Sequence, residues 1–267
     1  MKLIKLNKQA SLGIVLVVLA SINLAGENIN RGFDIAARSD RTDVGFKSSH
    51  VDMKMVLHNS AGKSSTRSLS LKTLEKPNEE VGDKSLIIFE TPADINGTAL
   101  LSHAKILDSD NQWLYLPALK RVKRISSANK SGPFVGSEFS FEDFTALELN
   151  KFTYKFLRNE KCGEFNCDVV ERYPQYKHSG YTKQVSWVDK THFQVRKVDF
   201  YDRRGDMLKT LVLKDYRQYK NQYWRAHKLS MVNHQTKKKT DLLYSSYEFK
   251  TEVNDREFNK SVLKRIR

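Results

Sequence analysis

Apolar and polar residues alternate with a period of two through most of the chain from residue 50 onward. Val51, Met53 and Met55 fall on one side of an extended segment, because successive side chains of a strand point to opposite faces. After a turn at 59–62, residues 65–74 return with the same alternation, which predicts a hairpin. Comparable patterns predict further strands at 85–90, 98–107, 111–116, 152–159, 166–173, 181–189, 193–201, 207–218, 223–234 and 239–250.

These short strands follow one another at near-regular spacing and are joined by turns such as 203–206. Strands do not alternate with helices, so the pattern favours an antiparallel meander over a doubly wound sheet. A strongly twisted sheet of about ten strands tends to curl on itself. We therefore expect a mainly β fold (α+β): a single curved antiparallel sheet that forms an incomplete β-barrel with a helical or loop lid. Whether its concave side is a filled core or a ligand cavity is left open by the pattern.

Two segments have the character of helices. Residues 30–39 place Phe33, Ile35 and two alanines among polar residues, which predicts an amphipathic helix of about three turns. The tail, 256–267, has four apolar residues among basic ones and is expected to form a short docking helix.

The most distinctive stretch is 111–144. In its first strand Trp113 and Tyr115 share one face, and Leu114 and Leu116 share the other. Pro117 and Ala118 end this strand. A basic run follows, and its ordinary interpretation is a solvated face; a contact with anionic headgroups or a membrane surface is the alternative. Its cations are Lys120, Arg121, Lys123 and Arg124.

A glycine-marked segment with four aromatic residues completes the stretch. One interpretation is a buried hairpin followed by a loop that its own aromatics fix in place. The other is a mobile flap over an apolar cavity beside the cationic run. The four aromatics are Phe134, Phe139, Phe141 and Phe144.

This region resembles the signature of a LolA-like family of bacterial periplasmic proteins, the outer membrane lipoprotein-sorting proteins. The resemblance implies a LolA/LolB-type fold: an unclosed antiparallel barrel, a helical lid and a cavity for acyl chains. It also implies a transporter of the resistance-nodulation-division (RND) class as a partner. The matching residues are Phe89–Pro92, Asn96–Leu100, Asp110, Gln112–Val122, Arg124–Ile125, Phe134, Gly136–Ser137, Phe139 and Phe141–Asp143.

In a barrel of this kind we expect two groups of site residues. The cavity wall and lid are assigned to Trp113, Tyr115, Leu116, Phe134, Phe139, Phe141 and Phe144. The contacts with anionic headgroups or a partner protein are assigned to Lys120, Arg121, Lys123 and Arg124.

The N-terminus has the character of a secretory signal peptide. Three lysines precede a short apolar run at 11–20, well below the ~20 residues of a membrane-spanning helix. Cleavage after Ala25, or nearer Ala20, would release a mature domain of about 26–267 into the periplasm. The net charge of +15 favours anionic partners. Export makes nucleic acid an unexpected partner and leaves a lipid, a lipid-modified protein or the membrane surface.

The two cysteines, Cys162 and Cys167, flank a glycine-containing turn. In an oxidising compartment this arrangement predicts a disulfide. A metal site is the rival interpretation, but two sulfurs without neighbouring ligands fall short of the four that zinc takes.

Catalytic motifs are missing from the sequence. It contains no Gly-x-Ser-x-Gly elbow, no His-Glu-x-x-His and no glycine-rich phosphate loop, and its seven histidines are scattered. Glu142 and Asp143 are adjacent, so on a strand they would face opposite sides. We therefore expect no enzyme, cofactor or metal, and a carrier that shelters acyl chains during outer membrane lipoprotein or lipid trafficking. A non-catalytic adaptor of an envelope transport complex is the alternative, and a hydrolase with a dispersed site is least favoured.

Overall fold

The computed structural model describes residues 11–76 and 82–266. The predicted signal peptide lies mostly outside this description: residues 1–10 are not described, and residues 11–25 are described as backbone only.

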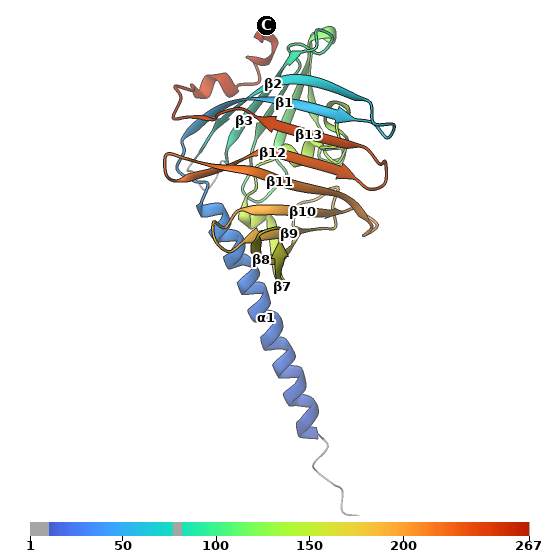
Figure 1. Ribbon diagram of the computed structural model, residues 1–267, viewed down its shortest axis with the longest axis vertical. Coiled ribbons are helices and arrows are strands. Elements are labelled where there is room, and N and C mark those ends of the chain that lie inside the picture. The colour runs from blue at the N-terminus through green and yellow to red at the C-terminus, as the bar shows by residue number, and fades with distance from the viewer. Residues whose placement is uncertain (1–10, 77–81, 267) are drawn as a thin grey trace, which may run out of the picture.

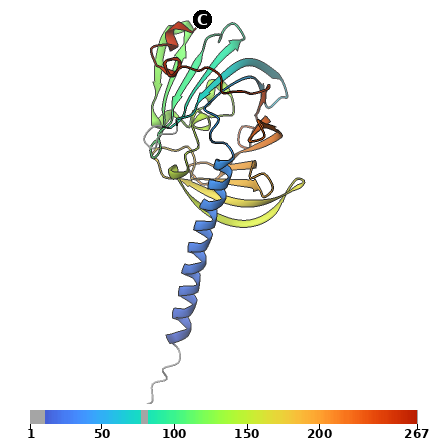
Figure 2. The same cartoon turned by 90° about the vertical axis from the view of Figure 1, so that its left-hand side faces the viewer.

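One antiparallel sheet of 14 strands makes up the body of the protein (Figure 1). Its order is β6-β5-β4-β3-β2-β1-β13-β12-β11-β10-β9-β8-β7, with β14 paired to β1. The edge strands β6 and β7 are not paired with each other in the described chain, so the curved sheet stays open, as the sequence predicts (Figure 2). The first seven strands are β1 (Ser48–His58), β2 (Ser64–Leu74), β3 (Lys84–Thr91), β4 (Ala99–His103), β5 (Asn111–Leu116), β6 (Arg121–Ile125) and β7 (Phe152–Cys162). The other seven are β8 (Phe165–Pro174), β9 (Lys183–Asp189), β10 (Val195–Tyr201), β11 (Met207–Tyr219), β12 (Tyr223–Asn233), β13 (Lys239–Tyr244) and β14 (Glu248–Phe249).

The alternation read from the sequence decides which face of each strand is buried. In β1, Val51, Met53 and Met55 are buried on the concave face, whereas Asp52 and Lys54 are exposed. The main core lies on this concave face and collects apolar residues from most of the sheet, among them Leu69, Ile87, Phe89, Leu100, Val198, Met231 and Leu242.

A second core lies on the outer face of β3, β4 and β5, under the C-terminal tail. Phe258 and Leu263 of the tail are fully buried against Leu86, Leu101 and Tyr115. The tail docks as expected, but it forms two 3-10 turns, Asp255–Phe258 and Leu263–Arg265, rather than one helix.

The only α-helix of the described chain, α1 (Ser11–Arg41), is longer than the predicted 30–39 segment and includes it. Its C-terminal part packs on β7 and β8 through Ile35, which is buried beside Tyr154 and Val170. Gly32 permits this close approach, because a Cβ there would lie 2.8 Å from the backbone nitrogen of Lys155. The earlier part of α1 extends away from the barrel (Figures 1 and 2). Within the described residues, no helix combines the length and the apolar character that crossing a membrane would require.

Candidate functional site

A cavity of about 1000 Å³ opens on the concave side of the sheet. The end of α1 and the loop that follows it, residues 36–46, form one side of the cavity, and strands from both halves of the sheet form the rest. Much of the wall is apolar and comes from Leu71, Ile87, Val170, Val188, Leu213 and Leu229. Residues far apart in the sequence therefore meet around one cavity.

The segment 130–145, which we call the plug, fills the rest of the concave side. Phe134 is fully buried, with its ring centroid 5.5 Å from that of Phe89 and 4.6 Å from that of Phe144. Phe139 is buried in the same cluster, and Phe144 also lines the cavity. The plug thus belongs to the concave core, and Phe144 at its end borders the cavity.

Two adjacent carboxylates hold the plug in place. Glu142 is buried and accepts hydrogen bonds from the Tyr176 hydroxyl at 2.6 Å and from the Gly180 N–H at 2.7 Å. Asp143 accepts hydrogen bonds from the Tyr181 hydroxyl at 2.7 Å and from Lys209 Nζ at 2.6 Å. Burial raises the pKa of Tyr181 well above its ordinary value, so its hydroxyl stays a donor.

The backbone carbonyl of Asp110 holds the other end of the plug. Lys151 forms a buried ion pair with the Asp110 carboxylate, and Lys130 Nζ donates to the Asp110 carbonyl and, at 2.6 Å, to Ser109 Oγ. Burial lowers the pKa of Lys130 to about 8. These contacts favour the interpretation of the segment as a fixed loop, and the sequence pattern gave no sign of the anchoring carboxylates.

Acidic side chains surround the mouth of the cavity. Burial raises the pKa of Asp83 to about 6 and that of Glu148 to about 7, with neighbouring carboxylates adding to the effect. Burial also raises the pKa of Asp43 to about 6, against the opposing pull of its ion-pair partner Arg225. Lys76, Lys84 and Arg225 line the same cavity, so its charged side chains include both signs.

The seven residues predicted for the cavity wall and lid divide between the two faces of the sheet. Leu116, Phe134, Phe139, Phe141 and Phe144 belong to the concave core. Trp113 and Tyr115 instead lie on the outer face, under the tail. Of the seven, Phe144 alone lines the cavity, and a contact of any of the seven with a ligand stays a prediction.

The predicted cationic contacts lie on or beside the edge strand β6. Lys120, Arg121, Lys123 and Arg124 are all exposed, and none of them lines the cavity. Arg124 donates to Asn111 Oδ1 at 2.8 Å. Exposed cations on an edge strand discourage pairing with another chain, and a role in binding headgroups stays a prediction.

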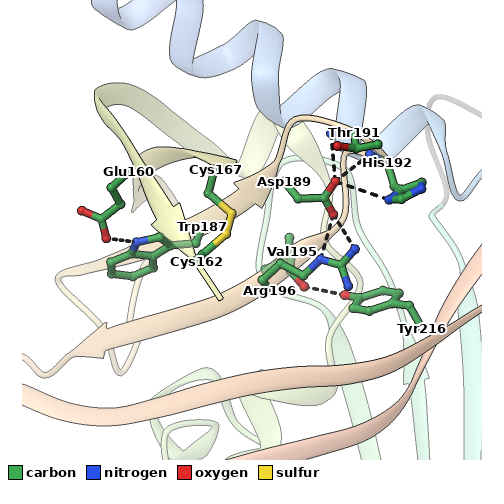
Figure 3. The surroundings of a disulfide bond; sticks show 10 residues. All are labelled: Glu160, Cys162, Cys167, Trp187, Asp189, Thr191, His192, Val195, Arg196 and Tyr216. Atoms are coloured by element: carbon green, nitrogen blue, oxygen red, sulfur yellow. Dashed lines mark hydrogen bonds and ion pairs between the residues drawn. A yellow bond between two sulfur atoms is a disulfide. The ribbon is translucent and has the colours of Figure 1, made fainter. Parts of the chain in front are cut away.

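Cys162 and Cys167 form a disulfide at the end of the β7–β8 hairpin, as the sequence predicts (Figure 3). The bond packs on the outer face beside Val169, Val185 and Trp187. Across the described part of the chain, no group of three or more histidines, cysteines and acids is placed to hold a metal ion.

Comparison with known proteins adds the following. A family model described as "Uncharacterized protein" matches residues 82–265. No curated protein matches the chain. The crystal structure of an outer membrane lipoprotein-sorting protein domain from Vibrio parahaemolyticus is 49% identical, has a TM-score of 0.86, and the match covers 89% of this chain and 100% of that one.

Two more solved structures are similar. A DUF1329 family protein from Desulfovibrio piger is 27% identical with a TM-score of 0.83, over 88% of this chain and 99% of that one. A LolA superfamily protein from Nitrosomonas europaea is 19% identical with a TM-score of 0.68, over 85% of this chain and 97% of that one, and shares the fold.

Proposed function

This chain belongs to the LolA-like family of outer membrane lipoprotein-sorting proteins, and from this premise we propose that it carries the acyl chains of a lipid or lipoprotein in its cavity. The observation that supports the proposal most is the cavity of about 1000 Å³ on the concave side of the open sheet. A filled barrel would have favoured an adaptor instead.

The size and chemistry of the cavity suit hydrocarbon. A methylene takes up about as much space as a water molecule, ~30 Å³, so the cavity has room for on the order of 30 methylenes. Hiding acyl chains from water is worth ~0.8 kcal/mol per methylene, so one long chain supplies on the order of 10 kcal/mol. Walls built from Leu71, Val188, Leu213 and Leu229 offer the apolar surface that this transfer needs.

A carrier must also release its cargo, which requires an element that moves. The plug is tied to the barrel by buried hydrogen bonds and by the ion pair between Asp143 and Lys209. The end of α1 lines the mouth through Ala36, Ser39 and Asp40. In this proposal the end of α1 acts as the lid, and the plug sets the depth of the cavity.

The cellular setting follows from the same proposal. The basic, then apolar N-terminus supports export to the periplasm, where a sorting protein would meet lipid-modified proteins and the membrane surface. An RND-type inner-membrane transporter is the partner that the family resemblance implies. Lipoprotein and free phospholipid both fit an apolar cavity of this size.

Native mass spectrometry of protein isolated from the cell envelope tests the proposal. We expect the wild type to carry bound lipid and Leu229→Trp, which fills the cavity, to carry less. Leu119→Trp is the matched control, because Leu119 is exposed and outside the cavity. A lipid-free wild type that still captures a transporter would overturn the carrier and support the adaptor.

A further inference from the structure

Two polar side chains interrupt the apolar wall of the cavity. Arg172 on β8 and Ser186 on β9 both line it. The strands pair so that Val170 lies opposite Ser186, and Arg172 lies opposite Gln184. Arg172 and Ser186 are therefore diagonal neighbours on one face, a spacing of roughly 7 Å that long side chains span.

The hydroxyl of Ser186 has no hydrogen-bond partner among the described residues. Ser186 is only 7% exposed, and it lines the cavity. A buried hydroxyl that makes no hydrogen bond is costly. Its place in the cavity wall is therefore suited to a polar group that arrives with a ligand.

Arg172 lacks a counterion. Its Nε donates to Gln184 Oε1 at 2.7 Å, and its Nη2 donates to the same oxygen, which leaves other donors of the guanidinium free. No carboxylate of the described chain lies within ion-pair distance of it. Asp143 acts on it electrostatically, but Lys209 and Tyr181 already bind that carboxylate.

Two deeply placed lysines differ from Arg172 in this respect. Lys209 is paired with Asp143, and Lys151 with Asp110. The guanidinium of Arg172 instead lies 5.0 Å from the centroid of the Phe152 ring, and burial lowers its pKa. A partly buried cation without a carboxylate partner is free to pair with an anion that arrives from outside.

We propose that Arg172 and Ser186 bind the anionic group, a carboxylate or a phosphate, of the amphiphile whose chains occupy the cavity. The inference rests on the proposed carrier function and specifies its ligand class. The planar guanidinium fits the oxygens of either anion, and Ser186 supplies a further donor. The neighbouring Val170 and Val188 would contact the hydrocarbon.

The test uses delipidated full chain and displacement of a fluorescent apolar probe by two ligands with the same hydrocarbon chain, palmitate and hexadecanol. A hydrogen-bonded ion pair predicts that palmitate binds about 10-fold to 100-fold tighter. Arg172→Met should abolish this preference and leave hexadecanol unchanged. Arg172→Lys should keep part of it, and Ser186→Ala, a minimal change, should reduce it several-fold. Arg158→Met, at an exposed position outside the cavity, is the matched control.

Two further ligands test whether the anion must belong to a lipid. A lysophospholipid of equal chain length should show the same dependence on Arg172, whereas inorganic phosphate alone should not displace the probe. Equal affinity of the wild type for palmitate and hexadecanol would overturn this inference and leave the carrier intact. Failure of both ligands to displace the probe would instead count against the carrier function.

Discussion

The ion pair between Lys209 and Asp143 gives the sharpest prediction about what fixes the plug. The two side chains are 3% and 6% exposed, and Nζ lies 2.6 Å from Oδ2. Removing one partner of a buried pair typically costs about 3–5 kcal/mol, because the other charge stays buried without compensation. For Lys209→Met we expect about 3 kcal/mol, since the Tyr181 hydroxyl still donates to Asp143.

A double-mutant cycle measures the pair itself. Lys209→Met, Asp143→Asn and the double variant are unfolded in urea, and the coupling energy is taken from the four free energies of unfolding. The double variant should be less destabilised than the sum of the two single variants, because it leaves no unpaired charge. A loss below about 1 kcal/mol in Lys209→Met, or strict additivity, would refute the view that this pair fixes the plug.

Three further predictions concern packing, pH and the disulfide. Phe134→Ala should cost about 3–5 kcal/mol in urea unfolding, because Phe134 is fully buried among three other phenyl rings; a cost below about 1 kcal/mol would contradict its place in the core. Burial raises the pKa of Glu148 from 4.5 to about 7, so the folded state keeps a proton that the unfolded chain has lost, and this contribution to stability declines as pH rises from about 4.5 to about 7. The urea midpoint should therefore fall less steeply with rising pH in Glu148→Gln than in the wild type. Equal pH dependence of the two midpoints would contradict a raised pKa of Glu148. Replacing Cys162 and Cys167 by serine opens a short loop and should lower the free energy of unfolding by about 2 kcal/mol. An unchanged urea midpoint would contradict this prediction.

The sequence predicts the strands well because burial follows their period. The predicted 207–218 and 152–159 correspond to β11 (Met207–Tyr219) and β7 (Phe152–Cys162). The helical segments are less well predicted. The tail forms 3-10 turns, since contacts with the barrel decide its conformation and a sequence window does not contain those contacts.

The site is harder to predict because a period of two separates the faces of a strand without saying which face is concave. The period correctly predicts that Trp113 and Tyr115 lie on one face of β5 and Leu114 and Leu116 on the other. The tail, more than 130 residues away in the sequence, makes the outer face apolar as well, so both faces look like a core. Arg172 and Ser186 become neighbours only once β8 and β9 are in register.

Photolabelling with a diazirine-bearing fatty acid, followed by peptide mass spectrometry, tests the central claim most directly. If the concave cavity holds acyl chains, adducts should fall on its wall, at residues such as Val188, Leu213 and Leu229. Adducts confined to the outer face around Trp113 and Tyr115, or no adducts at all, would contradict the claim.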